Sequence, residues 1–547
     1  MIIFVLMNKI LFTLCLTFGY FISISQPKNE RVERPKLVVG IVVDQMRPDY
    51  LYRFANRFGK NGFLRMMQDG NVCENTFINY LPSFTAPGHA CVYTGSVPSL
   101  HGIASNDWTE RASNTHNYCV ADKMANNVGG TTKAGKMSPK NLWANTITDE
   151  LRLATNFRAK VIAVSVKDRG AILPGGHSSN GSYWMDDSNG VFMTSDFYMK
   201  KLPNWVSQFN QQNKADFYMK KDWNTLYPIE TYIESTKDDN SYESKLRNES
   251  NTAFPHKTST WPLNDIKKVP YGNDMVCDFA KEALINEHLG QDDETDFLAV
   301  SFSSTDYVGH YYGPNSIELE DTYLRLDKNI ASLFELLDRE VGQGNYTIFL
   351  TADHAAAHNP QFLIDQKIPA GFLFASTIKT VLDAKLENQF GEKNILSSVY
   401  DNYLWLNDSI IKAHNLDKSE IKKVIIDELK FRDEIQYVVD LQYAQLAPIP
   451  EKIKQKIING FVEKRSGDLI LILKPGWIDA YSKTGTTHGA WNPYDTHIPL
   501  VWYGWGIKPG ATIKEVYMTD IAATLATLLH IQMPNACIGT TIQEVLK

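Results

Sequence analysis

The chain has 547 residues, with 55 Lys and Arg against 62 Asp and Glu, which gives a formal net charge of -7 at pH 7. Because this balance is mildly acidic and contains no basic block, we expect neither a nucleic acid nor an anionic membrane surface as a partner. The length is too great for one simple core but suits a single large α/β domain with insertions.

The N-terminus carries the features of an export signal. A single positive residue, Lys9, precedes an apolar stretch over residues 10–24, and small serines stand just before the polar segment that follows. This pattern predicts a cleaved signal peptide over residues 1–25, with Met1 or Met7 as the start, and no stable membrane anchor. We therefore expect a periplasmic or secreted protein.

Five cysteines follow the predicted signal peptide, an odd number for a protein in an oxidising compartment. They are Cys73, Cys91, Cys119, Cys277 and Cys537. Cys73 and Cys91 flank one loop and are candidates for a disulfide. Buried free thiols are the alternative, because pairing cannot be deduced from sequence.

Four short apolar runs are predicted as buried strands of a parallel sheet, since they are bounded by polar turns and rich in β-branched residues. In chain order they cover residues 37–43, 161–165, 297–301 and 346–351. They lead respectively to Asp44, to Lys167-Asp168-Arg169, to Asp306 and His310, and to Asp353-His354. Open α/β sheets bind ligands beyond the carboxyl ends of such strands, so we expect the functional site there.

The order of elements predicts an α/β fold with a mostly parallel central sheet flanked by helices. Strand and helix patterns alternate from residue 35 to about residue 178, as in half of a doubly wound sheet. Two segments depart from this pattern, at about 179–286 and about 390–475, and are predicted as inserted cap segments. We expect a single catalytic domain over residues 26–547 that contains both insertions.

Further elements are predicted in the second half of the chain. They are helices at 418–429 and 449–458, strands at 468–473 and 498–503, and a helix at 515–529 with a cap near Thr519.

A group of Asp and His residues is a candidate metal site. Asp306 and His310 are four residues apart and face the same way on a helical turn. Asp353 and His354 are adjacent at a strand end, and His488 lies in a Thr-Thr-His-Gly loop. Each has an ordinary structural explanation alone, but their joint placement favours a metal. Mixed Asp and His donors select zinc or a similar transition ion over magnesium or calcium.

Thr85 is the candidate nucleophile. It stands where a loop enters an apolar stretch, with Pro87 after it, which is also the pattern of an ordinary helix N-cap. The N-terminus of a helix stabilises both an alkoxide and a phosphate. His89, one turn further on, is expected to support the site or pack against it.

Together these residues resemble the two-zinc site of the alkaline phosphatase superfamily. The resemblance rests on Asp44, Thr85, Asp306-x-x-x-His310, Asp353-His354 and His488-Gly489. Asn106, Lys167 and Arg169 make the set similar to the PafA-type bacterial alkaline phosphatases, whose nucleophile is threonine. The motifs span nearly the whole chain after the signal peptide, so their combination is specific although each one is short.

The resemblance implies a role for each residue. One zinc ion would be held by Asp306, His310 and His488. The other would be held by Asp44, Asp353, His354 and Thr85. The non-bridging phosphoryl oxygens would be held by Asn106, Lys167 and Arg169.

The implied activity is hydrolysis of small-molecule phosphate monoesters by a monomeric enzyme, through a phosphothreonine, with release of inorganic phosphate and an alcohol. The nearest alternative is a phosphodiesterase or nucleotide pyrophosphatase of the same superfamily, but Lys167 and Arg169 favour a dianionic monoester. A sulfatase would need a Cys/Ser-x-Pro-x-Arg segment, which is missing around Thr85. A non-catalytic exported zinc- or glycan-binding protein is an alternative of another class.

Overall fold

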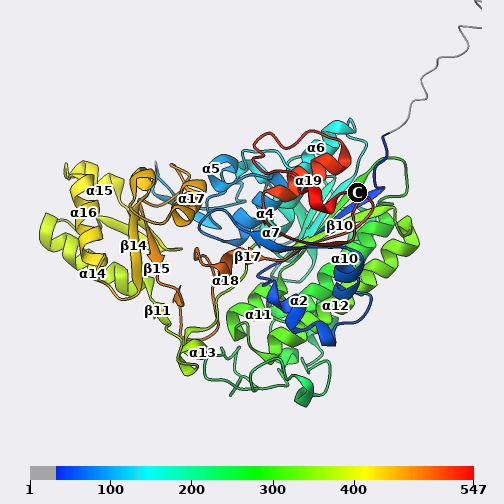
Figure 1. Ribbon diagram of the computed structural model, residues 1–547, viewed down its shortest axis with the longest axis horizontal. Coiled ribbons are helices and arrows are strands. Elements are labelled where there is room, and N and C mark those ends of the chain that lie inside the picture. Colours follow the sequence, from blue (N-terminus) through cyan, green and yellow to red (C-terminus); the bar gives the residue numbers. More distant parts are fainter. Residues whose placement is uncertain (1–31, 112, 132) are drawn as a thin grey trace, which may run out of the picture. The chain divides into compact units, whose positions relative to one another are not determined.

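An eleven-stranded sheet with a parallel centre forms the core of the protein (Figure 1). β1 (Leu37–Val43) lies between β10 (Tyr346–Thr351) and β9 (Asp296–Phe302), and β9 pairs with β6 (Val161–Ser165), all in parallel. Every residue of these strands is buried. The predicted fold class is confirmed, and the four predicted strands are correct to within one residue at each end.

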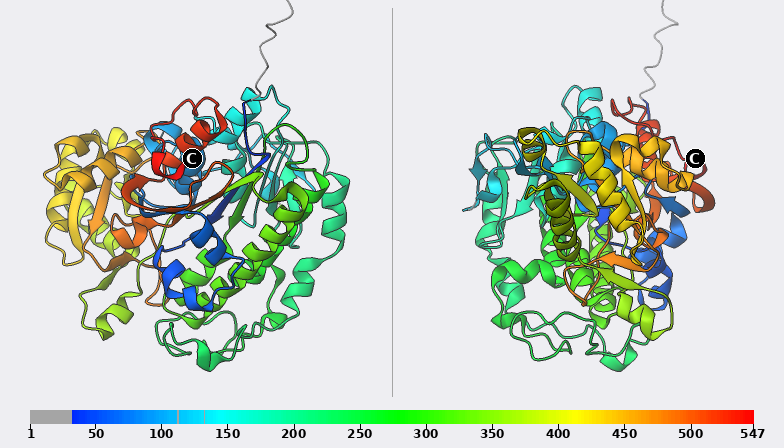
Figure 2. Two further views of the ribbon diagram at one scale, coloured as in Figure 1. Left: turned by 45° about the vertical axis from the view of Figure 1, so that its right-hand side comes forward. Right: turned by 90° about the vertical axis from the view of Figure 1, so that its left-hand side faces the viewer.

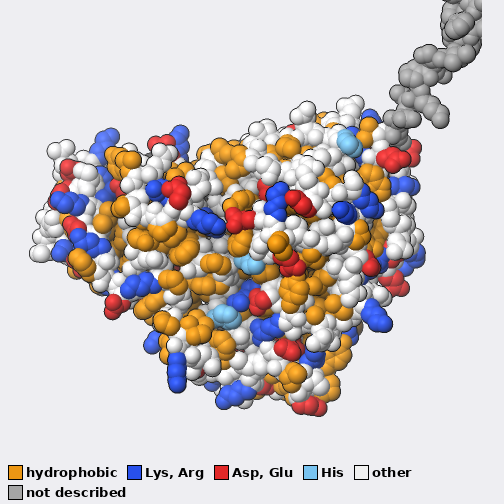
Figure 3. All heavy atoms as spheres, viewed as in Figure 1, with side chains coloured by type: hydrophobic (Ala, Val, Ile, Leu, Met, Phe, Trp, Pro, Cys, Tyr) orange, Lys and Arg blue, Asp and Glu red, His pale blue; other side chains and the backbone are white. Residues whose placement is uncertain are grey.

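The computed structural model describes residues 32–111, 113–131 and 133–547, so the predicted signal peptide lies outside the described residues. Pro35–Lys547 form one compact unit. Within the described ranges, no helix is both long enough and apolar enough to cross a membrane. Cys73 and Cys91 are buried free thiols, so they form no disulfide. Charges of both signs are interspersed on the face drawn in Figure 3, in keeping with the small net charge.

Helices cover both faces of the sheet, which explains why its central strands are apolar throughout (Figure 2). One face carries a group of helices that pack on one another, namely α4 (Thr85–Thr94), α6 (Ile147–Ala154), α7 (Asp168–Gly175) and α19 (Asp520–Leu529). The other face is covered by α10 (Tyr271–Asn286), against which α12 (Ile317–Leu337) packs.

The main sheet reaches further along the chain than expected. β7 (Gly181–Met185) pairs in parallel with β6, and β8 (Phe192–Ser195) pairs antiparallel with β7. Both strands fall inside the segment at about 179–286 that we expected to be an insertion. The sequence of β7, Gly-Ser-Tyr-Trp-Met, lacks the β-branched residues that marked the other buried strands, although all five of its residues are buried.

A separate antiparallel sheet lies within residues 396–473. It consists of β12 (Leu396–Tyr400), β13 (Tyr403–Leu406), β15 (Leu469–Leu473) and β14 (Ile435–Asp440), in that order. It shares a hydrophobic core with α14 (Ala375–Phe390) and α16 (Lys418–Leu429). The helix predicted at 418–429 is confirmed, and the helix predicted at 449–458 is α17 (Glu451–Gly460).

Two predictions near the C-terminus need correction. The strand predicted at 498–503 is divided at Pro499, which has no N–H to donate, into β17 (His497–Ile498) and β18 (Leu500–Gly504). The helix predicted at 515–529 begins only at Asp520, with Thr519 as its N-cap as predicted. Residues 515–517 belong instead to β19 (Gly510–Tyr517), which pairs in parallel with β2 (Asn71–Phe77), so sheet pairing outweighs the helical pattern there.

The first turn of α4 packs directly on the segment that follows β10. A Cβ atom at Gly88 would lie 2.4 Å from the carbonyl oxygen of Asp353 and 2.7 Å from its Cβ. Only a residue without a side chain lets the two backbones approach this closely, so Gly88 fixes the distance between α4 and Asp353.

We predict that Gly88→Ala destabilises the protein even though alanine favours the helix by about 1 kcal/mol. Overpacking of this kind typically costs about 1–3 kcal/mol. The clash is with backbone atoms of Asp353, which cannot relieve it by a side-chain rotation. Thermal unfolding followed by circular dichroism would show a lower Tm than in the parent. A Tm equal to or above that of the parent would show that the contact can relax.

Candidate active site

The predicted site residues meet at one edge of the sheet, where β1, β6, β9 and β10 end. Asp44 follows β1, and Asp306 lies on α11 (Ser304–Tyr312), which begins two residues after β9. Lys167 follows β6 and contacts both carboxylates, since its Nζ lies 2.7 Å from Asp44 Oδ2 and 2.6 Å from Asp306 Oδ2. Asp44 and Asp306, which lie 123 and 139 positions from Lys167 in the sequence, are thus joined around its buried ammonium group.

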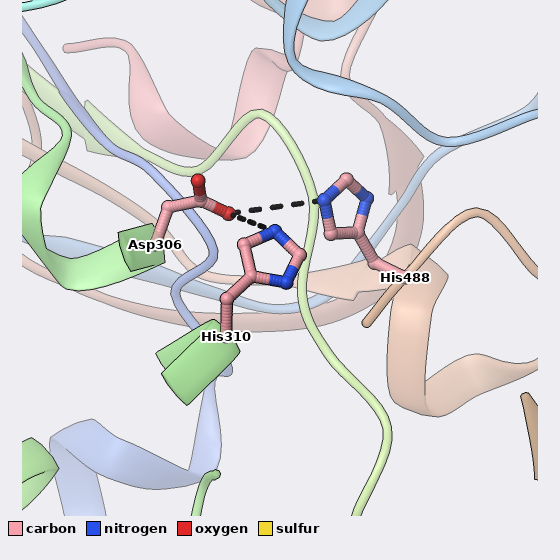
Figure 4. Close-up of side chains that lie close together, drawn as sticks. All are labelled: Asp306, His310 and His488. Carbon is pink, nitrogen blue, oxygen red and sulfur yellow. Dashed lines mark ion pairs between the residues drawn. The ribbon is translucent and has the colours of Figure 1, made fainter. Parts of the chain in front are cut away.

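Asp306, His310 and His488 form one cluster that could hold a metal ion (Figure 4). Asp306 Oδ1 lies 3.1 Å from His310 Nε2 and 3.8 Å from His488 Nε2. The Nδ1 atoms of His310 and His488 donate to the carbonyl oxygens of Thr486 and Ser83, each at 2.8 Å. These bonds leave both Nε2 atoms as lone-pair donors toward the cluster, the tautomer that a metal ligand requires.

A second cluster contains Asp44, Asp306 and His354. His354 Nε2 lies 3.4 Å from Asp44 Oδ1 and 3.6 Å from Asp353 Oδ2. Those two carboxylate oxygens are buried and accept no hydrogen bond from the described residues. Buried carboxylate oxygens without a donor, beside an imidazole nitrogen, fit a bound cation. Asp306 takes part in both clusters, whereas the resemblance assigned it to the first alone.

Thr85 lies beside the second cluster, with Oγ1 at 3.5 Å from His354 Nε2. It is the first residue of α4, and the N-cap is Phe84, so the alternative that Thr85 is an ordinary N-cap is wrong. The Thr85 side chain contacts His354 of the cluster instead. His89 contacts the carbonyl oxygen of Thr85 at 2.9 Å and Asp353 Oδ2 at 3.3 Å, so it supports both residues as expected.

The three predicted phosphate-binding residues lie close to this site on different segments. Asn106 accepts a hydrogen bond at 2.9 Å from the backbone N–H of Ala86, next to Thr85. Arg169 donates through Nη1 to Tyr118 Oη at 3.0 Å, and its buried Nε has no partner among the described residues. Lys167 is the only one of the three that contacts the Asp cluster directly.

The charges in the pocket are strongly coupled. Burial raises the pKa of the Asp44 carboxyl well above its usual value, and Asp353 adds to the rise, while Lys167 opposes it. Burial also acts to raise the pKa of Asp306, but His310 and Lys167 hold it well below its usual value. Burial, assisted by His354 and His310, lowers the pKa of His488, so its imidazole is neutral. Burial acts to lower the pKa of His310, but Asp306 raises it above its usual value. A neutral imidazole beside an ionised carboxylate, as at His488 and Asp306, is a donor pair that zinc binds.

Two residues that contact the site, Gln45 and Tyr118, were not predicted from the sequence. Gln45 Nε2 donates to Asp306 Oδ1 at 2.7 Å, and the Gln45 backbone N–H donates to Asp353 Oδ1 at 3.2 Å, from a left-handed backbone with φ of 66°. Tyr118 Oη accepts from Arg169 and donates to Asp168. Only proximity to Asp44 in the sequence pointed to Gln45, and nothing pointed to Tyr118.

Comparison with known proteins gives full-length matches. The family model described as type I phosphodiesterase / nucleotide pyrophosphatase matches residues 38–497. Alkaline phosphatase PhoV of Synechococcus elongatus is 50% identical over 521 residues, which cover 95% of this chain and 94% of that protein. A protein named calcium-transporting ATPase from Myroides odoratus is 48% identical over 536 residues, covering 96% and 97%. Alkaline phosphatase PafA of Elizabethkingia meningoseptica is 45% identical over 524 residues, covering 95% and 96%.

Solved structures agree with these matches. The crystal structure of wild-type alkaline phosphatase PafA has a TM-score of 0.93 at 44% identity, and the match covers 95% of this chain and 100% of that one. A structure of a PafA variant with a threonine, an asparagine, a lysine and an arginine substituted has a TM-score of 0.92.

We predict that zinc stabilises the metal-free protein and that His310→Ala reduces this effect. A ligand present at 100 times its dissociation constant adds about 2.7 kcal/mol to the free energy of unfolding, which is measurable as a rise in Tm on titration with Zn²⁺. The control is His414→Ala, because His414 pairs with Glu392, and neither residue belongs to the two clusters. A parent protein whose Tm does not change on titration with Zn²⁺ would contradict the metal assignment.

Proposed function

The chain belongs to the type I phosphodiesterase / nucleotide pyrophosphatase family, among its alkaline phosphatases, and on this premise we propose that it is a two-zinc phosphomonoesterase with Thr85 as nucleophile. The observation that carries the proposal is the position of the buried Thr85 hydroxyl. It lies 3.5 Å from His354 Nε2, at the first residue of a helix and beside carboxylate oxygens that lack hydrogen-bond donors.

We propose that two zinc ions occupy the two clusters. Asp306, His310 and His488 would hold one ion, and Asp44, Asp353 and His354, with Thr85, would hold the other. When bound, such a pair of ions stabilises negative charge on both the attacking and the leaving oxygen of an in-line displacement. The lowered pKa values of His488 and His354, which keep these two imidazoles neutral, and the ionised Asp306 support this assignment.

The protein's own residues would carry the remaining steps. The Thr85 oxygen attacks phosphorus, a P–O bond to Thr85 forms as the bond to the alcohol breaks, and the alcohol leaves. Water then displaces Thr85 and releases inorganic phosphate. Asn106, Lys167 and Arg169 would hold the non-bridging oxygens, and the N-terminus of α4 favours the charge at Thr85. Two in-line displacements give net retention at phosphorus.

Two of the matched names suggest other reactions. The family description includes phosphodiesterases, and the Myroides odoratus relative is named a calcium-transporting ATPase. Monoester hydrolysis is supported by the two alkaline phosphatases that match over nearly their full lengths. It is also supported by the PafA variant, because its four substituted residue types are those of Thr85, Asn106, Lys167 and Arg169. A non-catalytic zinc- or glycan-binding protein would have no use for a hydroxyl held in this position.

We also propose the cellular context that the sequence indicates. Residues 1–25 would be a cleaved signal peptide, and residues 26–547 one catalytic domain with an insertion at about 390–475. The other predicted insertion, at about 179–286, contributes β7 and β8 to the main sheet and would be an insertion only beyond them. The enzyme would act as a monomer on small-molecule phosphate monoesters in the periplasm or outside the cell. The single positive charge and apolar stretch at the N-terminus support export.

We predict that Thr85→Ala abolishes covalent phosphorylation and leaves zinc binding largely intact, because the Asp and His ligands remain. Rapid mixing of enzyme with an aryl phosphate, followed by acid quench and mass spectrometry, would detect the phosphothreonine in the parent and not in the variant. Thr85→Ser is the matched control, since it keeps the hydroxyl and should become labelled. A normal burst in Thr85→Ala would identify another nucleophile.

We predict that Arg169→Ala and Lys167→Ala each lower kcat/KM for an aryl phosphate by about 100-fold or more, since they bind charge that develops on the phosphoryl oxygens. Hydrolysis of a bis-aryl phosphate, which has one charge fewer, should fall much less. Arg158→Ala is the control, because Arg158 is an exposed residue paired with Glu294. Equal losses on both substrates, or a parent that prefers the diester, would favour the phosphodiesterase alternative.

A further inference from the structure

The two loops that carry His354 and His488 meet at one buried residue. The imidazole rings stack with their centroids 3.4 Å apart and an angle of 15° between their planes. His354 follows β10, and His488 lies in the loop before α18 (Pro493–Thr496). Since the two rings belong to different metal clusters, the relative position of these loops sets the distance between the clusters.

Asp495, on α18, contacts both loops through its side chain and its backbone carbonyl. Its Oδ2 accepts a hydrogen bond at 2.7 Å from the N–H of Ala490, two residues after His488. The N–H of Ala357, in the loop of His354, donates to the carbonyl oxygen of Thr487, next to His488, at 3.3 Å. The backbone carbonyl of Asp495 accepts a hydrogen bond at 3.0 Å from the N–H of Ala355, next to His354. One side chain and its own backbone therefore tie the two histidine loops together.

Arg47 connects the third ligand segment to the same place. It lies three residues after Asp44, and its Nη1 donates to the carbonyl oxygen of Ala356 at 3.3 Å and contacts His358 Nε2 at 3.1 Å. Burial raises the pKa of the Asp495 carboxyl well above its usual value, and the positive charge of Arg47 opposes the rise. Arg47 and Asp495 thus lie near the same loop, residues 355–358, and link it to the segments of Asp44 and His488.

We propose that Asp495 is a positioning residue that sets the spacing of His354 and His488, and so the affinity of the protein for its pair of metal ions. This inference rests on the proposed two-zinc function. Asp495 is 1% exposed and lies outside both metal clusters, so its effect would be transmitted through the loop backbones. Metal sites need their ligands held to within about 0.5 Å, which makes the support of the loops decisive.

The contact with Ala490 explains why a side-chain acceptor is needed at this position. The N–H of Ala490 donates to Asp495 Oδ2 at 2.7 Å, whereas Oδ1 is buried with no hydrogen-bond partner among the described residues. Asparagine keeps one acceptor for Ala490 but places an NH₂ group where Asp495 Oδ1 lies buried without a hydrogen-bond partner. Leucine keeps the branched skeleton and replaces both oxygens by methyl groups. The expected order of zinc affinity is therefore Asp, then Asn, then Leu.

Asp327 is a matched control for loss of stability alone. It is also a buried aspartate that accepts backbone hydrogen bonds, from Phe63 N–H at 2.8 Å and from Gly59 N–H at 2.7 Å, and it is 3% exposed. It lies on α12, outside both metal clusters. Asp327→Asn should lower the Tm of the metal-free protein as Asp495→Asn does, while leaving zinc affinity unchanged.

The experiment measures zinc binding directly on the full-length mature enzyme. Asp495→Asn, Asp495→Leu, Asp327→Asn and the parent are loaded with Zn²⁺ and titrated with a chromogenic chelator, and the Tm of each metal-free form is recorded. We expect at least one of the two zinc ions to be held tenfold or more weakly in both Asp495 variants. We also expect excess zinc to restore part of their kcat.

Two outcomes would overturn the inference. One is parental zinc affinity in both Asp495 variants, and the other is an equal loss in Asp327→Asn, which would mean that general destabilisation is the cause. A parent that binds no zinc, or fewer than two ions, would instead overturn the proposed function on which the inference rests. The parent titration therefore separates the two failures.

Discussion

The carboxylates of Asp44, Asp306 and Asp353 are buried in one pocket at the carboxyl edge of the sheet. Burial of an ionised carboxylate is costly unless a cation or several donors compensate it, and here the three groups repel one another as well. Lys167 compensates Asp44 and Asp306 through contacts of 2.7 and 2.6 Å. One oxygen each of Asp44 and Asp353 still has no donor among the described residues. The pocket therefore requires more positive charge than its own residues supply, which is the physical basis of the metal assignment.

The fold meets this requirement by bringing strand ends together in register. Val43 of β1 lies opposite Phe302 of β9, and Val42 lies opposite Thr351 of β10, so the residues that follow each strand emerge side by side. α4 then approaches Asp353 closely at Gly88, which sets Thr85 at the same edge. The strands determine where the carboxylates lie, and the packing of α4 determines how near the hydroxyl comes to them.

The sequence was informative where one local pattern decided the structure. The runs before Asp44 and Asp353 are apolar throughout because helices cover both faces of the sheet, and such runs can be recognised without a partner. The pattern failed where pairing decided the outcome. Residues 515–517 fit a helix, yet they pair with β2. β7 contains no β-branched residue, yet all five of its residues are buried where it pairs with β6 in the sheet.

Site residues divide in the same way. The proposed metal ligands and phosphate-binding residues lie at strand ends or in short motifs, and the sequence predicted them. The residues that hold them in place are distant in sequence, as with Tyr118 against Arg169 and Asp495 against Ala490. Such contacts follow from the tertiary fold, in which a hairpin or a one-turn helix lies beside a loop from elsewhere in the chain. A single sequence carries no periodicity or spacing that reports them.

The phosphate-binding side of the site is built apart from the metal side. Asn106 immediately precedes the hairpin of β3 (Asp107–Glu110) and β4 (Thr115–Tyr118), and Tyr118 at the end of that hairpin binds Arg169. None of these residues contacts the Asp and His clusters in a hydrogen bond or ion pair within the described chain. Lys167 alone belongs to both sides, since it neutralises Asp44 and Asp306. Changes at Asn106 or Arg169 can therefore alter which phosphate ester is accepted with little effect on the metal site. A change at Lys167 must alter two things, the positive charge available to the substrate and the positive charge that compensates the buried carboxylates of Asp44 and Asp306.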